Sequence, residues 1–201
     1  MKPGLKKITR AICDTFPNFD SRGRLVYEKL DRSILRAFYL NPCSNKDHPQ
    51  YECFVIPLYI ISEGIYFSFG HTVRVETTFE ELNAPVNIDR VTSKLWEAYR
   101  QFLRPIESEK EFMDFLINRP FSIASVYSVA VIYTYFKMGA PVAYSGICNE
   151  AIRLLNKHKL RNLEVRDQVS IMLSSDDPRR IIEMLRANET TMKKRLGIQL
   201  G

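Results

Sequence analysis

The chain has 201 residues, of which 45% are hydrophobic and 26% charged, values that are ordinary for a soluble globular protein. A chain of this length buries about 70% of its unfolded surface, so neither a metal nor a disulfide is required for folding. The formal net charge of +6 is divided into +2 (14 − 12) over residues 1–100 and +4 (15 − 11) over residues 101–201. The chain therefore lacks the concentrated positive charge of a dedicated nucleic-acid binder.

The four cysteines, Cys13, Cys43, Cys53 and Cys148, form no close pair of the CxxC type. The N-terminal residues are basic but lack the apolar core and cleavage site of a signal peptide. No segment approaches the roughly 20 apolar residues that cross a membrane. We therefore expect a cytoplasmic protein with reduced thiols and no membrane association.

The N-terminal third predicts one helix followed by an antiparallel meander of about four strands. Residues 4–16 place apolar side chains at helical spacing, and Pro17-Asn18 should end that helix. Residues 24–30 and 33–40 are strand-like runs on either side of a tight turn at Asp31-Arg32.

The most apolar segment spans residues 52–70 and consists of two runs separated by Ser62-Glu63-Gly64. Both runs are rich in β-branched and aromatic residues, and Gly64 suits a turn, so the segment predicts a β-hairpin. Because both faces of such a hairpin are apolar, we expect it at the centre of the sheet.

After residue 76 the apolar spacing becomes helical, and five or six packed helices are expected. The predicted helix starts are Asp89, the capping box of Ser108 and Glu111, and Asp177 before Pro178. Residues 123–138 are apolar nearly all round, which predicts a buried helix ended by Gly139.

Together these patterns predict an α+β fold. An N-terminal helix and an antiparallel sheet of about four strands, residues 1–85, should pack on an all-helical subdomain, residues 86–201. No low-complexity linker separates the two parts, so we expect one compact unit.

A zinc site is the first chemical hypothesis. Cys43, His48 and Cys53 follow a C-x4-H-x4-C spacing, with His71 further along, and these residue types are zinc ligands. The pattern lacks the close cysteine pair of most zinc sites, and burial in a strand explains Cys53 equally well. No metal and no cofactor are predicted.

Evidence for a catalytic or phosphate-binding site is weaker than that for a zinc site. The sequence contains no nucleophile elbow, no P-loop and no dinucleotide-binding fingerprint. Ser145 is interpreted as a helix cap, and His158 as a cation at a helix carboxyl end. The run Ser174-Ser175-Asp176-Asp177 is interpreted as a turn and cap, with a divalent-ion role as the alternative.

Charge patterning leaves two kinds of macromolecular partner open. The basic clusters are Lys2, Lys6, Lys7 and Arg10; Lys157, Lys159 and Arg161; and Lys193, Lys194 and Arg195. They could contact nucleic acid, although solvated helix faces explain them as well. The stretch between the two predicted parts is acidic compared with the rest of the chain. It could steer a basic protein partner or serve solubility alone, and its acidic residues are Glu76, Glu80, Glu81, Asp89 and Glu97.

Three segments resemble an uncharacterised family of small bacterial α+β proteins: residues 26–40, 54–70 and 176–198. The matching features are Pro57-Leu58-Tyr59, Phe69-Gly70 and Glu189-Thr190-Thr191 followed by Leu196, with His71 where arginine is expected. The resemblance implies no catalytic residue. Relatives of this size and style look like immunity or accessory proteins of bacterial toxin systems.

We therefore expect a non-enzymatic protein that binds or masks a protein partner, as an immunity protein does. The alternatives are a nucleic-acid-binding protein that uses the basic clusters and an enzyme with a dispersed site near the sheet. The candidate binding residues are Tyr59, His71, Arg74 and Glu76, and no catalytic residue is assigned.

Overall fold

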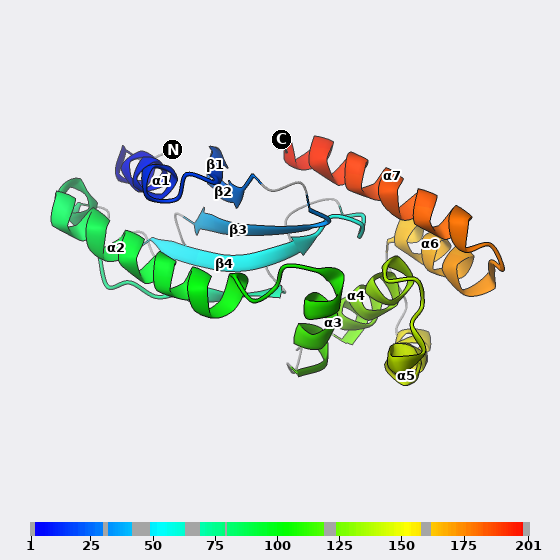
Figure 1. Ribbon diagram of the computed structural model, residues 1–201. Helices are drawn as coiled ribbons and strands as arrows, with labels where there is room; N and C mark the ends of the chain where they lie inside the picture. The colour runs from blue at the N-terminus through cyan, green and yellow to red at the C-terminus, as the bar shows by residue number, and fades with distance from the viewer. Residues whose placement is uncertain are drawn as a thin grey trace. The chain divides into compact units, whose positions relative to one another are not determined.

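The computed structural model describes residues 3–29, 32–41, 49–62, 69–78, 80–118, 124–157 and 162–198. Its elements divide between two units (Figure 1). The first unit comprises Met1–Ile56, Tyr66–Pro105 and Gly197–Gly201, and the second comprises Pro57–Ile65 and Ile106–Leu196. The order of an N-terminal helix, an antiparallel sheet and then helices confirms the predicted α+β class.

The first unit is built on a five-stranded antiparallel sheet whose strands lie side by side in chain order. They are β1 (Phe19–Arg22), β2 (Leu25–Glu28), β3 (Ile34–Asn41), β4 (Gln50–Pro57) and β5 (Gly70–Val73). β1 was not predicted from the sequence. It forms a hairpin with β2 because Gly23 adopts a φ of +63°, as the first position of a tight hairpin turn requires.

The first strand of the hairpin predicted over residues 52–70 is wrong beyond Pro57. β4 ends at Pro57, and its antiparallel partner β5 begins only at Gly70, so residues 58–62 leave the sheet. Proline cannot donate to the ladder, which suits the end of a strand. The apolar run continues beyond it because Leu58, Tyr59 and Ile61 are buried in the second unit. The turn residues Glu63 and Gly64, and residues 65–68 of the second predicted strand, lie outside the described residues.

Helices cover one face of this sheet. They are α1 (Pro3–Thr15), a 3₁₀ turn η2 (Glu81–Asn83), α2 (Pro85–Ala98) and a π-helical turn η3 (Tyr99–Leu103). The predicted first helix is confirmed, with Leu5, Ile8 and Ile12 fully buried. α2 starts at Pro85, four residues before the predicted Asp89, because proline suits the first position of a helix.

The second unit contains α3 (Glu109–Asn118), α4 (Ala124–Lys137), a 3₁₀ turn η4 (Val142–Tyr144), α5 (Ser145–Asn156), α6 (Leu163–Ser174) and α7 (Pro178–Leu196). The cap at Asp177 is confirmed, because its Oδ1 accepts the Arg179 N–H at 2.9 Å. Gly139 adopts a φ of +80° just after α4, as predicted for a helix end. Ser145 does not cap α5, since it is the first residue of the helix and its hydroxyl donates to the Val142 carbonyl.

The division of the chain at residue 85 remains a prediction. The two units of the structure divide elsewhere, because residues 86–105, with α2 and η3, belong to the first unit. Residues 57–65 belong with the helices of the second unit, although they connect two strands of the sheet.

Candidate functional site

The four candidate binding residues are split between the two units. Tyr59 belongs to the second unit, whereas His71, Arg74 and Glu76 belong to the first. Arg74 and Glu76 are exposed and follow the end of β5. Tyr59 is fully buried, and burial raises the pKa of its hydroxyl well above the usual value, which does not suit a proton donor near neutral pH.

His71 has the most distinctive neighbours of the four. It lies directly opposite Cys53 in the β4–β5 ladder, and its ring packs edge-on against Phe102 of η3 at a centroid distance of 4.7 Å. Opposed residues share one face of a sheet. Burial, with a smaller contribution from Glu52, raises the pKa of the Cys53 thiol, so the reactive thiolate is strongly disfavoured.

The zinc pattern is only partly covered by the structure. Cys43 and His48 lie outside the described residues, while Cys53 and His71 are neighbours on adjacent strands. Within the described ranges, no three His, Cys, Asp or Glu side chains are grouped closely enough to hold a metal ion. Cys53 and His71 alone offer two ligands, whereas a structural zinc site needs four.

A buried ion pair joins β2, β3 and the π-helical turn. Glu28 and Arg36 are 5% and 3% exposed, and the Arg36 Nε–H donates to Glu28 Oε2. The other carboxylate oxygen of Glu28 accepts the Tyr99 hydroxyl at 3.2 Å, and Arg36 Nη1 donates to the Arg104 carbonyl at 3.1 Å. The pair therefore fixes both ends of η3 on the sheet.

The π-helical geometry itself places these groups. The Arg104 N–H bonds to the Tyr99 carbonyl at 2.8 Å, one residue further back than in an α-helix. The burial of Tyr99 raises the pKa of its hydroxyl, and the negative charge of Glu28 adds to this effect while Arg36 opposes it. The hydroxyl therefore stays protonated and remains a donor to Glu28. Single π-turns are frequent at functional sites.

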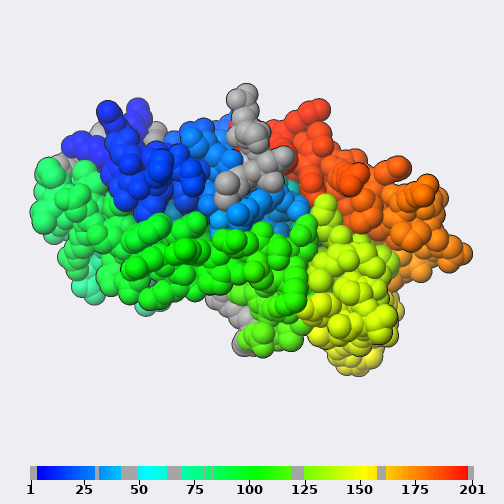
Figure 2. Space-filling model, viewed as in Figure 1, coloured from blue at the N-terminus to red at the C-terminus, as the bar shows by residue number. Residues whose placement is uncertain are grey.

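Tyr99 also belongs to a cluster of three aromatic rings and one arginine, part of which reaches the surface. We call this cluster the Trp96 patch; it consists of Phe16, Trp96, Tyr99 and Arg100. The Trp96 ring stacks on Phe16 at 4.5 Å and on Tyr99 at 5.3 Å, and the Arg100 guanidinium lies 5.8 Å from its centroid. Trp96 is partly exposed and Arg100 is exposed. Figure 2 shows the outer surface of α2, in green, bordering that of α1, in dark blue.

The Trp96 patch was not predicted from the sequence. Trp96 is the only tryptophan of the chain, and Arg100 follows it at the i+4 spacing that brings two helical side chains together. That spacing is the signal that could have identified it. The contact with Phe16, 80 positions away in the chain, has no such local signal.

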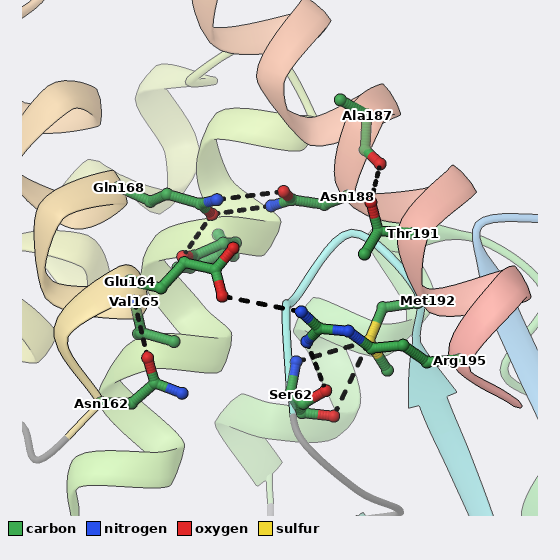
Figure 3. A network of polar contacts seen from close by, with 11 residues as sticks. Ser62, Asn162, Glu164, Val165, Gln168, Ala187, Asn188, Thr191, Met192 and Arg195 are labelled. Atoms are coloured by element: carbon green, nitrogen blue, oxygen red, sulfur yellow. Dashed lines mark hydrogen bonds and ion pairs between the residues drawn. The ribbon is translucent and has the colours of Figure 1, made fainter.

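In the second unit, Tyr59 is part of a polar network that anchors residues 57–62 to the helices. Figure 3 shows the Gln168–Asn188 pair of this network and the contacts of Ser62 with Met192 and Arg195. Asn188 of α7 donates to the Tyr59 carbonyl at 2.9 Å and exchanges hydrogen bonds with Gln168 of α6 at 2.7 and 3.0 Å. Gln168 Oε1 also accepts the Tyr133 hydroxyl at 2.9 Å. Each side-chain amide thus has a partner inside the unit, and the network has the composition of a structural anchor.

The basic clusters are only partly available at the surface. Lys2, Lys159 and Arg161 lie outside the described residues. Arg195 is engaged within its own unit, since Nη1 donates to the Ser62 carbonyl at 2.8 Å and Nη2 lies 3.8 Å from Glu164 (Figure 3). Lys6, Lys7 and Arg10 are exposed on α1.

Charge differs between the two units. Counting the described residues, the first unit has 13 Lys and Arg against 9 Asp and Glu, a net charge of +4, whereas the second has 11 of each. The positive surplus therefore lies in the unit that carries the Trp96 patch.

Comparison with protein-family models, with curated proteins and with solved structures gives no match. The resemblance noted in the sequence therefore remains a prediction. Among the helices of the described ranges, none combines the length and the apolar character that crossing a membrane requires.

The first unit combines a buried ion pair, a buried thiol and a partly exposed aromatic cluster. Glu28 and Arg36 are buried as a pair, burial raises the pKa of the Cys53 thiol, and the partly exposed Trp96 indole lies beside the exposed Arg100 guanidinium. Tryptophan, tyrosine and arginine are the residues that carry most binding energy in protein interfaces.

Proposed function

We propose that this protein is a non-enzymatic binding protein that takes a protein partner on the Trp96 patch. The observation that carries the proposal is the partly exposed Trp96, which stacks on both Phe16 and Tyr99 and has the Arg100 guanidinium over its ring. Masking of a partner, as by an immunity protein, would be one form of this activity.

Preorganisation supports the proposal. The Glu28–Arg36 ion pair holds Tyr99 and the Arg104 carbonyl, and Tyr99 in turn stacks on Trp96. A surface whose side chains are already fixed loses less conformational entropy when a partner binds. The rotamer of Trp96 is therefore set before the partner arrives.

The test compares proteins captured from an extract of the native host by the wild-type chain and by two variants. Trp96→Ala removes the central ring, and Arg186→Ala removes an exposed cation from α7 in the other unit. We expect at least one protein whose recovery falls about thirtyfold with Trp96→Ala and stays unchanged with Arg186→Ala, since loss of a hot-spot residue costs about 2 kcal/mol or more.

Circular dichroism and the thermal midpoint of each variant verify that the fold persists. A set of captured proteins that is the same for the wild type and for a folded Trp96→Ala variant would contradict the proposal.

A further inference from the structure

The helices that carry the Trp96 patch have an uneven charge. Together α1, α2 and η3 contain six Lys or Arg and three Asp or Glu, a net charge of 6 − 3 = +3. All six cations are exposed: Lys6, Lys7, Arg10, Arg90, Lys94 and Arg100. The two helices contact each other, and Phe16, which follows α1, stacks on Trp96 of α2.

Ion pairing within the helices increases this imbalance. Asp14 lies 3.7 Å from Arg10, and Glu97 accepts a hydrogen bond from Lys94 at 3.1 Å. In the described part of the chain, no ion pair engages Lys6, Lys7, Arg90 or Arg100, and the one carboxylate on these helices outside the two pairs is Asp89. Four cations and one carboxylate are thus left for a partner.

From this charge pattern we infer that the partner presents an acidic segment with an apolar anchor residue. The anchor packs beside Trp96, and carboxylates of the segment face Arg100 and its neighbours. Exposed charge pairs add mainly to the association rate and to the choice of partner, while the aromatic contact supplies most of the affinity. This inference rests on the proposed function, whose site it specifies further.

The same surface suits a protein segment better than nucleic acid. Proteins that bind single strands stack the bases on open aromatic faces, whereas the Trp96 ring is already stacked on Phe16 and Tyr99.

The probe is a displayed library of random 16-residue peptides without tryptophan, selected on the immobilised full chain. We expect the enriched peptides to carry a net negative charge and at least one large apolar residue. Their affinity should fall about thirtyfold with Trp96→Ala, the loss of a hot-spot residue. It should fall about tenfold with Arg100→Glu, because charge reversal replaces attraction by repulsion at an exposed position. Arg186→Ala on α7 is the matched control and should leave the affinity unchanged.

Arg100→Glu keeps the Trp96–Phe16 stack, so the inference stays testable where Trp96→Ala lowers the thermal stability. Enriched peptides that bind in a Trp96-dependent way but are neutral or basic would overturn the inference that the partner is acidic. They would still support the Trp96 patch as the binding surface. An absence of any peptide that depends on either Trp96 or Arg100 would overturn both. Tighter, Arg100-dependent binding of a 20-base-pair DNA duplex than of any selected peptide would assign the surface to nucleic acid instead.

Discussion

Glu28 and Arg36 are charged side chains held inside the first unit, where each accounts for the burial of the other. The guanidinium donates to the carboxylate and to the Arg104 carbonyl, and the carboxylate also accepts the Tyr99 hydroxyl. Removing one partner of such a pair leaves an uncompensated charge in a medium of low polarity. The pair thus has a larger effect on stability than a surface ion pair has.

We predict that Arg36→Ala lowers the free energy of unfolding by about 3–5 kcal/mol, the cost of breaking a buried pair from one side. Lys94→Ala, which removes the exposed pair with Glu97, should cost no more than about 1 kcal/mol. Urea denaturation of both variants measures the difference. Equal costs for the two variants would mean that the Glu28–Arg36 pair does not hold the π-turn on the sheet.

Gly70 lies where two strands approach each other too closely for a side chain. A methyl group at this position would be 2.4 Å from Phe54 Cβ and 2.5 Å from the Cys53 carbonyl oxygen. We predict that Gly70→Ala destabilises the protein by about 1–3 kcal/mol, as overpacking does. The control is Gly146→Ala in α5, where nothing lies within 4 Å, and it should raise stability by about 0.5–1 kcal/mol. A thermal midpoint of Gly70→Ala equal to or above that of the wild type would refute the close approach.

At the scale of elements, the capping box predicts how α3 responds to pH. Glu111 Oε2 accepts the N–H groups of Glu107 and Ser108, each at 2.8 Å, and these bonds lower the pKa of the carboxyl below its ordinary value of 4.5. A lowered folded pKa stabilises the folded state above the unfolded pKa, and this stabilisation is lost as the pH falls through the folded pKa. The contribution should therefore be full at pH 7 and vanish in acid.

The measurement compares the wild type with Glu111→Gln, in which the position no longer titrates, by urea unfolding from pH 7 down to about pH 3. We predict that the stability advantage of the wild type shrinks as the pH falls below 4.5. An advantage that is independent of pH would show that the charge of Glu111 contributes nothing to the cap.

Asn188 of α7 holds the middle of segment 57–62 through the Tyr59 carbonyl. Asn188 is 3% exposed, and its amide donates to the Tyr59 carbonyl and to Gln168. We predict that Asn188→Leu lowers the free energy of unfolding by about 1–3 kcal/mol, because it leaves buried polar groups without partners. Hydrogen exchange of the amides of residues 58–62 should accelerate in this variant. Thr190→Ala, on the exposed side of the same helix, is the control, and an equal effect there would rule out a specific role for Asn188.

Elements with local signals could be predicted from the sequence, and elements set by distant contacts could not. The capping box of α3, the Asp177 cap and the Gly139 helix end each depend on residues within a few positions. Residues 58–62 could not be assigned in this way. Their apolar run has the composition of a strand, but their backbone bonds to Asn188 and Arg195, each more than 100 positions away.

At the scale of the whole molecule, the class of fold followed from where strand-like and helix-like patterns lie along the chain, and the candidate site did not. Glu28 and Arg36 occupy strand positions where charged residues ordinarily face solvent, so their pairing inside the first unit could not be predicted from local patterns. Of the predicted residues, His71 lies near η3, whereas Tyr59 proved to be a buried anchor. The contact between Phe16 and Trp96 exists only in the folded chain.

The central claim is that a protein partner binds on the Trp96 patch, and the fluorescence of Trp96 tests it most directly. Because the chain has a single tryptophan, its emission reports on this patch alone. Titration with the tightest tryptophan-free peptide from the selection should shift the emission to shorter wavelength as the indole loses water, with a midpoint equal to the calorimetric dissociation constant. Calorimetric binding that leaves the emission of Trp96 unchanged would place the interface elsewhere and contradict the claim.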